Sequence, residues 1–120
     1  MKVLNRKIAP EFKEISDIGF QPANHSKLSN GIPVFEYNLG SQDLVKIEFV
    51  FEAGTKFQKK PLVASFTNSM LKEGTKNKTS LQIANAIDYY GAFLETEVNA
   101  DFGTVSLYTL NKHIEQVLPI

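Results

Sequence analysis

The sequence predicts an α+β domain in which an antiparallel or mixed sheet is covered by helices, preceded by an extended N-terminal arm. Three observations support this prediction. Apolar and polar side chains alternate over residues 45–52, as in a strand with one buried face. Two helix-like segments end at Gly74 and Gly91. Two strand-like runs flank a turn at residues 100–103. The expected order after the arm is β-β-α-α-β-β-α.

The composition restricts the classes of function. With 120 residues the chain holds one domain at most, and 13 basic residues balance 13 acidic ones. Zero formal charge argues against nucleic acid and against an anionic membrane surface as partners. The absence of cysteine excludes disulfides and thiolate metal sites. No run is long enough to span a bilayer and no signal peptide is visible, so we expect a soluble chain, cytoplasmic or periplasmic.

Residues 1–26 carry prolines, a glycine and scattered charges without sustained periodicity, so we interpret them as an extended N-terminal arm, with the domain proper at residues 27–120. An alternative is that the apolar residues of the arm form one short helical turn packed on the core. Those residues are Ile8, Phe12, Ile15, Ile18 and Phe20.

The first two strands are expected on either side of a polar loop. Asn30 and Gly31 both accept a positive φ and predict a turn, which leads into a strand at residues 32–37. Pro33 places that strand at an edge, or marks its start. The second strand is residues 45–52 and should bury one face. The buried side chains would be Val45, Ile47, Phe49 and Phe51.

A short amphipathic helix is predicted from Pro61 to Gly74. Pro61 suits the first turn, where its missing N–H costs nothing, and Gly74 suits a left-handed cap. Ser65, Asn68 and Ser69 stand three and four residues apart, so they share one face of this helix. That face is small and polar, which is typical of a solvated or hydrogen-bonded stripe.

A second helix follows. Thr79 and Gln82 form a capping box at its start, and Gly91 closes it. Its apolar face consists of Ile83, Ile87 and Tyr90.

The last three elements are two strands and a helix. Residues 93–99 and 104–110 are predicted to pair as antiparallel strands. Asn111 is predicted to cap a third helix at residues 112–118. The inner side of that helix would carry Ile114, Val117 and Leu118.

Four short runs of residues occur before, within and at the end of the Pro61–Gly74 helix. In chain order they are Leu28–Ile32, Glu52–Thr55, Ser65–Ser69 and Glu73–Lys76. In this order and spacing the segment from residue 28 to residue 120 resembles the N-terminal part of a domain of the insulinase-like zinc peptidases. These are the enzymes of the pitrilysin and mitochondrial processing peptidase type. The resemblance covers nearly all of this chain but only a fraction of a family protein.

The resemblance implies that the zinc site is lost. The family helix carries H-x-x-E-H, in which two histidines bind Zn²⁺ and the glutamate acts on the metal-bound water. Here Ser65, Asn68 and Ser69 hold the three positions. Serine hydroxyls are poor zinc ligands and an asparagine cannot accept a proton. A further glutamate ligand of the family would lie beyond Ile120. We therefore expect no catalytic residue, no metal and no cofactor.

Other chemistry has weaker support. A serine nucleophile needs a nearby base, and His25 and His113 are far from the serines in sequence, with no oxyanion-hole glycine motif. Glu95, Glu97 and Asp101 are expected on one face, as a solvated surface or, alternatively, a weak cation site.

Peptide binding is the family property that does not need the metal. In the family, substrate adds as an extra strand along the sheet edge beside the catalytic helix, held by backbone hydrogen bonds. The corresponding residues here are Phe93, Leu94, Glu95, Thr96, Glu97, Val98 and Asn99. The alternative is that this edge is paired or covered.

The resemblance thus predicts a non-catalytic member or fragment of the family. It would support peptide binding, or assemble with a zinc-bearing chain of the family or with the remainder of its own domain. One alternative is a structural or assembly module without a substrate role. Another is a truncated remnant that forms homo-oligomers through unpaired sheet edges. An active zinc metalloendopeptidase is what the family alone would imply, and the replaced positions argue against it.

Overall fold

The structure is a computed structural model that describes Lys7, Ala9 and residues 11–120. The chain divides into two units, Met1–Leu39 and Gly40–Ile120. Residues 11–23 of the first unit form neither helix nor strand. The alternative of a helical turn in the arm is therefore wrong for this part, and Ile8 lies outside the described residues.

The first unit contains a β-hairpin. Strand β1 (Asn24–Lys27) pairs antiparallel with β2 (Pro33–Glu36), and Gly31 in the turn has a φ of 87°, which confirms the predicted turn. Strand β1 was not predicted, because its sequence Asn-His-Ser-Lys is polar and has low strand propensity. The expected boundary of the arm, after residue 26, falls inside this strand.

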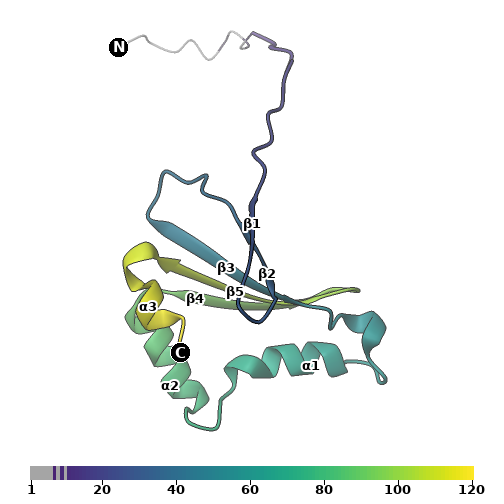
Figure 1. Ribbon diagram of the computed structural model, residues 1–120, viewed down its shortest axis with the longest axis vertical. Coiled ribbons are helices and arrows are strands. Elements are labelled where there is room, and N and C mark those ends of the chain that lie inside the picture. Colours follow the sequence, from purple (N-terminus) through teal and green to yellow (C-terminus); the bar gives the residue numbers. More distant parts are fainter. Residues whose placement is uncertain (1–6, 8, 10) are drawn as a thin grey trace. The chain divides into compact units, whose positions relative to one another are not determined.

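The second unit is built on a three-stranded antiparallel sheet. Its strands are β3 (Leu44–Phe51), β4 (Phe93–Val98) and β5 (Gly103–Leu110), in the order β3-β5-β4. The helices lie together on one side of this sheet (Figure 1). The α+β class with a helix-covered antiparallel sheet is confirmed.

The helix-covered face of β3 is buried only over its first half. Val45 and Ile47 are half-buried, whereas Phe49 and Phe51 are 46% and 50% exposed. The prediction of one fully buried face is therefore wrong. The reason is that the core is centred on Leu107, which pairs with Ile47, and the elements of this unit do not cover β3 beyond that point.

Helix α1 (Val63–Ser69) begins two residues later than predicted. The N–H of Val63 donates to the Lys60 carbonyl at 3.4 Å, and Leu62 has a φ of 71° and a ψ of −8°. These values describe a type II turn with Pro61 at its second position, a place that proline favours. Pro61 therefore shapes the turn before the helix instead of its first turn.

The end of this segment also differs from the prediction. Helix α1 continues as a 3₁₀ turn, Met70–Lys72, and Gly74 has a φ of 145°, far from the left-handed helical value. Gly74 instead forms an isolated bridge with Thr79, which leads the chain into the next helix.

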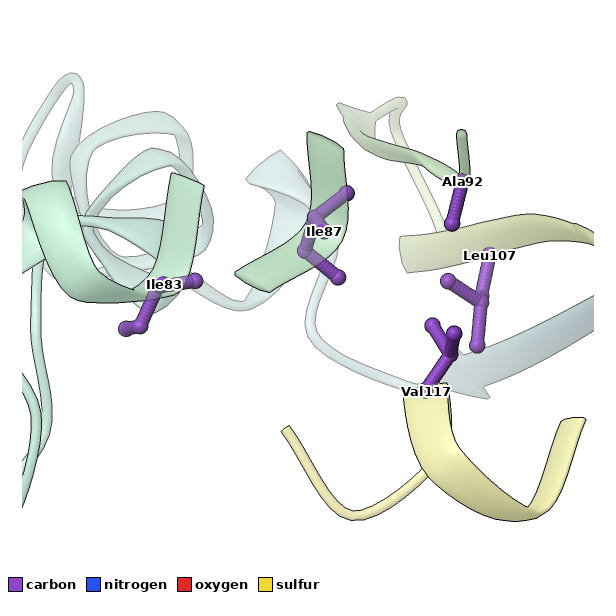
Figure 2. Packing of buried hydrophobic residues seen from close by; sticks show 5 residues of the cluster. All are labelled: Ile83, Ile87, Ala92, Leu107 and Val117. Atoms are coloured by element: carbon purple, nitrogen blue, oxygen red, sulfur yellow. The ribbon is translucent and has the colours of Figure 1, made fainter. Parts of the chain in front are cut away.

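Helix α2 (Ser80–Tyr89) has the predicted capping box. The Gln82 N–H donates to Thr79 Oγ1 at 3.3 Å, and the Thr79 N–H donates to Gln82 Oε1 at 2.9 Å. Gly91 follows with a φ of 60°. Figure 2 shows the core that this helix builds with the sheet and the C-terminal helix. Its buried residues are Ile83, Ile87, Ala92, Leu107 and Val117.

Replacing Thr79 with alanine removes the bond that Thr79 Oγ1 accepts from the Gln82 N–H and leaves the bond from the Thr79 N–H to Gln82 Oε1. We expect the free energy of unfolding of the second unit to fall by about 1 kcal/mol, the usual effect of losing an N-cap. Urea unfolding followed by circular dichroism measures it. Thr79→Ser keeps the hydroxyl and serves as the control, and an equal loss in both variants would contradict the role of the cap.

The C-terminal helix is shorter than predicted, and Asn111 does not cap it. Residues Asn111–His113 form a 3₁₀ turn and α3 covers only Ile114–Val117. The Asn111 side chain caps nothing, and its backbone N–H donates to the Asp43 carbonyl at 3.0 Å. Val117 is buried as expected, but Leu118 is 48% exposed. No helix in the described part of the chain is long and apolar enough to cross a membrane.

Candidate functional site

The site predicted from sequence is the face of α1 that meets the sheet. Asn68 is buried there, and its Nδ2 donates to the backbone carbonyl oxygens of Glu97 at 2.6 Å and of Thr104 at 3.2 Å. Glu97 and Thr104 are partners across β4 and β5. The amide therefore joins α1 to both strands at one point, using the donor that a glutamate at this position would lack.

Ser65 and Ser69 do not share this environment. Both serines are exposed, whereas Asn68 is buried. The predicted uniform polar face of α1 is thus divided between one residue held by the sheet and two residues in solvent. The N-terminus of the helix has a separate anchor, because the Ala64 N–H donates to Gln58 Oε1 at 3.2 Å.

The residues at the motif positions do not fit zinc. Zinc sites in proteins use imidazole, thiolate or carboxylate ligands, and Ser65 and Ser69 offer only neutral hydroxyls. Asn68 presents N–H groups to carbonyl oxygens, so its amide nitrogen is not a ligand. Within the described residues, no three side chains of His, Cys, Asp or Glu come together as a metal site.

The histidines lie against aromatic rings. The His25 ring meets Phe35 within the first hairpin at 4.5 Å between centroids, and the His113 ring meets Tyr90 at 5.2 Å. Among the described residues, neither histidine is hydrogen-bonded to a serine. Within the second unit, His113 therefore forms no Ser-His pair with Ser65 or Ser69.

The loop after β3 forms a backbone clamp on the turn between β4 and β5. The N–H groups of Gly54, Thr55 and Lys56 donate to the carbonyls of residues 101, 99 and 100, at 3.1, 2.9 and 3.0 Å. A Cβ at Gly54 would come closer than 3.0 Å to this turn, so only glycine fits. Sequence reasoning missed the clamp, since Gly54 appeared only as a member of the run Glu52–Thr55.

Asn99 stabilises the same turn from within. Its Oδ1 accepts hydrogen bonds from the N–H groups of Asp101 at 2.9 Å and Phe102 at 2.8 Å. Strand β4 ends at Val98, one residue before the predicted end of the peptide-binding edge. An ion pair between Lys56 and Asp101 lies outside the clamp. Within the described residues, Glu95, Glu97 and Asp101 form no group that could hold a metal ion.

The face of the sheet that the helices leave free carries one ion pair. Lys46 Nζ lies 2.7 Å from Glu48 Oε1, and the Ser106 hydroxyl donates to the same oxygen at 3.1 Å. The hydrogen bond from Lys46 is the main reason that the pKa of Glu48 lies below its ordinary value, and Ser106 adds to it. The pKa of Lys46 is raised, first by Glu48 and then by Tyr108.

Strand β4 is an edge strand of the sheet. It pairs with β5 on one side, and the sheet of the second unit has no strand on its other side. Leu94, Thr96 and Val98 turn toward the helices and are half-buried, whereas Phe93, Glu95 and Glu97 are exposed. The residues predicted to bind peptide therefore lie along an unpaired edge, next to Asn68 at one end.

Comparison with known proteins gives relatives of one kind. The chain is 33% identical over 70 residues to an uncharacterized zinc protease of Rickettsia bellii, which covers 57% of this chain and 17% of that protein. It is 37% identical over 59 residues to presequence protease 1, chloroplastic/mitochondrial, of Arabidopsis thaliana, covering 48% of this chain and 6% of the relative. No family model matches.

A solved structure shares the fold. The crystal structure of a peptidase M16 inactive domain from Pseudomonas fluorescens superposes with a TM-score of 0.76 at 24% sequence identity. The superposition covers 82% of this chain and 25% of that one. The chain thus spans about a sixth of its bacterial curated relative and a quarter of its structural neighbour.

The fold, an antiparallel sheet with a helix packed against its edge, is shared with a peptidase M16 domain. These comparisons confirm the predicted resemblance to the insulinase-like M16 peptidases.

Proposed function

We propose that this chain is a non-catalytic member of the insulinase-like family that supports proteolysis by binding extended peptide or by assembling with a zinc-bearing partner. The observation that carries the proposal is the amide of Asn68, which is buried and bonded to two carbonyl oxygens of the sheet. In the family this position holds the general base; here Asn68 instead hydrogen-bonds α1 to the sheet.

The loss of catalysis follows from the chemistry of the three positions. A metal-activated water needs a base that can accept its proton, and a carboxamide has no such capacity. Two exposed hydroxyls would have to replace two imidazoles as ligands. The likeness in fold to a domain described as inactive agrees with this view. We propose that the chain binds no zinc and requires no cofactor.

The unpaired edge of β4 supports the peptide-binding role. Binding by addition of a strand uses backbone groups and does not depend on a metal. The edge of β4 lies beside α1, which by resemblance is where family members bind their substrate. The backbone of β4 is held by its pairing with β5 and by the hydrogen bond from Asn68.

A second candidate function, an assembly module without a substrate role, is favoured by the outer face of α1. Phe66 on α1 and Met70, the first residue of the 3₁₀ turn that continues it, stand four residues apart and are 63% and 62% exposed. Apolar side chains grouped in this way are typical of surfaces that another protein covers. The cover would be a zinc-bearing chain of the family or the remainder of a larger domain.

Metal analysis and peptidase assays of the whole chain test the proposal. The chain alone should contain no stoichiometric zinc and cleave no peptide. A family protein with an intact H-x-x-E-H motif, encoded in the same genome, should gain activity or substrate affinity when this chain is added. Stable association without any change in cleavage would instead support the assembly module. Peptidase activity of the chain alone, sensitive to a chelator, would contradict both.

A further inference from the structure

We infer that the edge of β4 selects extended peptides with basic side chains at two alternate positions and a large apolar side chain at the position next to them. This inference rests on the proposed peptide-binding role and adds the class of peptide. It is carried by three features of the second unit: the free backbone groups of β4, the charges on its exposed face, and a hollow beside its first residues.

The backbone register of the edge sets the geometry. The Asn99 N–H bonds to the Phe102 carbonyl, and hydrogen-bonded pairs alternate along an antiparallel ladder. The backbone N–H and C=O groups of Glu95 and Glu97 therefore point toward β5, and those of Leu94 and Thr96 point away from it, toward the free side of the edge. An added antiparallel strand would bond to those two residues.

The exposed face of the edge is negative. Glu95 and Glu97 are exposed, and none of the ion pairs within residues 11–120 uses them. They stand two residues apart, so their spacing equals that of alternate side chains in an extended peptide, about 6.6 Å. Peptide residues opposite them would form non-hydrogen-bonded pairs, in which side chains come closest. Lysine or arginine at both positions complements this charge.

The other face of the edge is hollowed, and aliphatic side chains form part of the lining. A hollow of about 240 Å³ opens between α2 and the start of β4, with Ile83, Ile87 and Leu94 among its lining residues. Sites for drug-sized molecules are larger, from about 300 Å³ upward, so this hollow suits a single side chain. A peptide residue opposite Leu94 would point to this face of the sheet. The favoured peptide therefore reads basic, any residue, basic, apolar.

The same charges disfavour a second copy of the chain as occupant. If two β4 strands paired antiparallel with Thr96 of one copy opposite Thr96 of the other, Glu95 of each copy would lie opposite Glu97 of its partner. Like charges directly opposite each other destabilise a strand pair. A positively charged strand is the complementary partner.

Fluorescence anisotropy with a labelled, end-blocked peptide Thr-Lys-Thr-Lys-Leu-Thr tests the inference on the whole chain. We expect this peptide to bind about tenfold tighter than an all-threonine peptide, because two charged cross-strand pairs contribute within the usual range and tenfold corresponds to 1.4 kcal/mol. A scrambled peptide with adjacent lysines should lose part of the advantage, since only one lysine can then reach the acidic face and one of the two charged pairs is lost.

Three variants locate the effect. Glu95→Gln combined with Glu97→Gln should abolish the preference for lysine. Glu115→Gln, which changes an exposed residue on α3, is the control and should leave that preference unchanged. Ala84→Leu keeps a helix-favouring residue on α2 and narrows the hollow. It should weaken the binding of Thr-Lys-Thr-Lys-Leu-Thr and leave the affinity for the all-threonine peptide unchanged. Thermal melts confirm that each variant is folded.

The outcomes separate the two proposals. Equal affinity for all three peptides would overturn the inferred selectivity and leave edge binding intact. Absence of binding by every peptide would overturn the peptide-binding role and the selectivity with it, while the mixing experiment would still decide assembly. Preference for the lysine peptide that survives the double glutamine variant would show that Glu95 and Glu97 are not the recognising groups.

Discussion

Replacing Gly54 with alanine is expected to lower the melting temperature of the second unit by about 10 °C or more. An added Cβ would overlap the backbone of Ala100 and Asp101, and no flexible side chain can yield there. Overpacking of this kind costs about 1–3 kcal/mol, and each kcal/mol shifts the midpoint of a unit of this size by about 4–8 °C. Relief of the overlap would break the three backbone hydrogen bonds of the clamp.

Gly40→Ala provides the matched control. A Cβ at Gly40 would meet its nearest neighbours at 3.7 and 3.8 Å, which is ordinary contact, and no positive φ is required there. Scanning calorimetry of both variants should show a large loss for Gly54→Ala and almost none for Gly40→Ala. Similar melting temperatures in the two variants would contradict the clamp.

Replacing Asn68 with aspartate is expected to destabilise the second unit by about 2–4 kcal/mol at pH 7.5. The amide donor would become a buried carboxylate facing the carbonyl oxygens of Glu97 and Thr104, with no donor to compensate it. Asn68→Ala removes the same bonds but adds no charge, so it should cost less.

The difference between the two Asn68 variants should depend on pH. Burial among carbonyl oxygens raises the pKa of the introduced carboxyl group above its ordinary value of about 3.9. The folded state then holds its proton more tightly than the unfolded state. The extra destabilisation is therefore complete above the folded-state pKa and disappears as the pH falls toward 3.9. Urea unfolding at pH 4 and pH 7.5 measures it, and identical stabilities of the two variants at pH 7.5 would contradict a structural role of the amide.

Local signals in the sequence predicted much of the fold. The capping box at Thr79, the turn at Gly31 and the antiparallel pairing of the strands predicted at residues 93–99 and 104–110 depend on neighbouring residues, and all are present. The start of α1 was misplaced because proline at position 61 fits both a helical first turn and a type II turn, and only the positive φ of Leu62 distinguishes the two.

Features that depend on distant residues were not predicted. The clamp requires that residues 54–56 meet residues 99–101, more than 40 positions later, and glycine at position 54 is compatible with many turns. The alternation along β3 correctly indicated which side chains share the face toward the helices. It did not indicate how far along the strand this face is buried, because burial depends on what packs above Phe49 and Phe51. Asn68 was predicted as a lost general base, and its new partners became visible only with the sheet in place.

Titration of the whole chain with Zn²⁺ in a calorimeter tests most directly whether the motif helix has lost its metal. We expect no site of micromolar or tighter affinity in the natural chain. The double variant Ser65→His with Ser69→His, which places two imidazoles one helical turn apart, should gain measurable binding. Binding of one equivalent of zinc to the natural chain with a Kd near 1 μM, about −8.2 kcal/mol, would contradict the central claim.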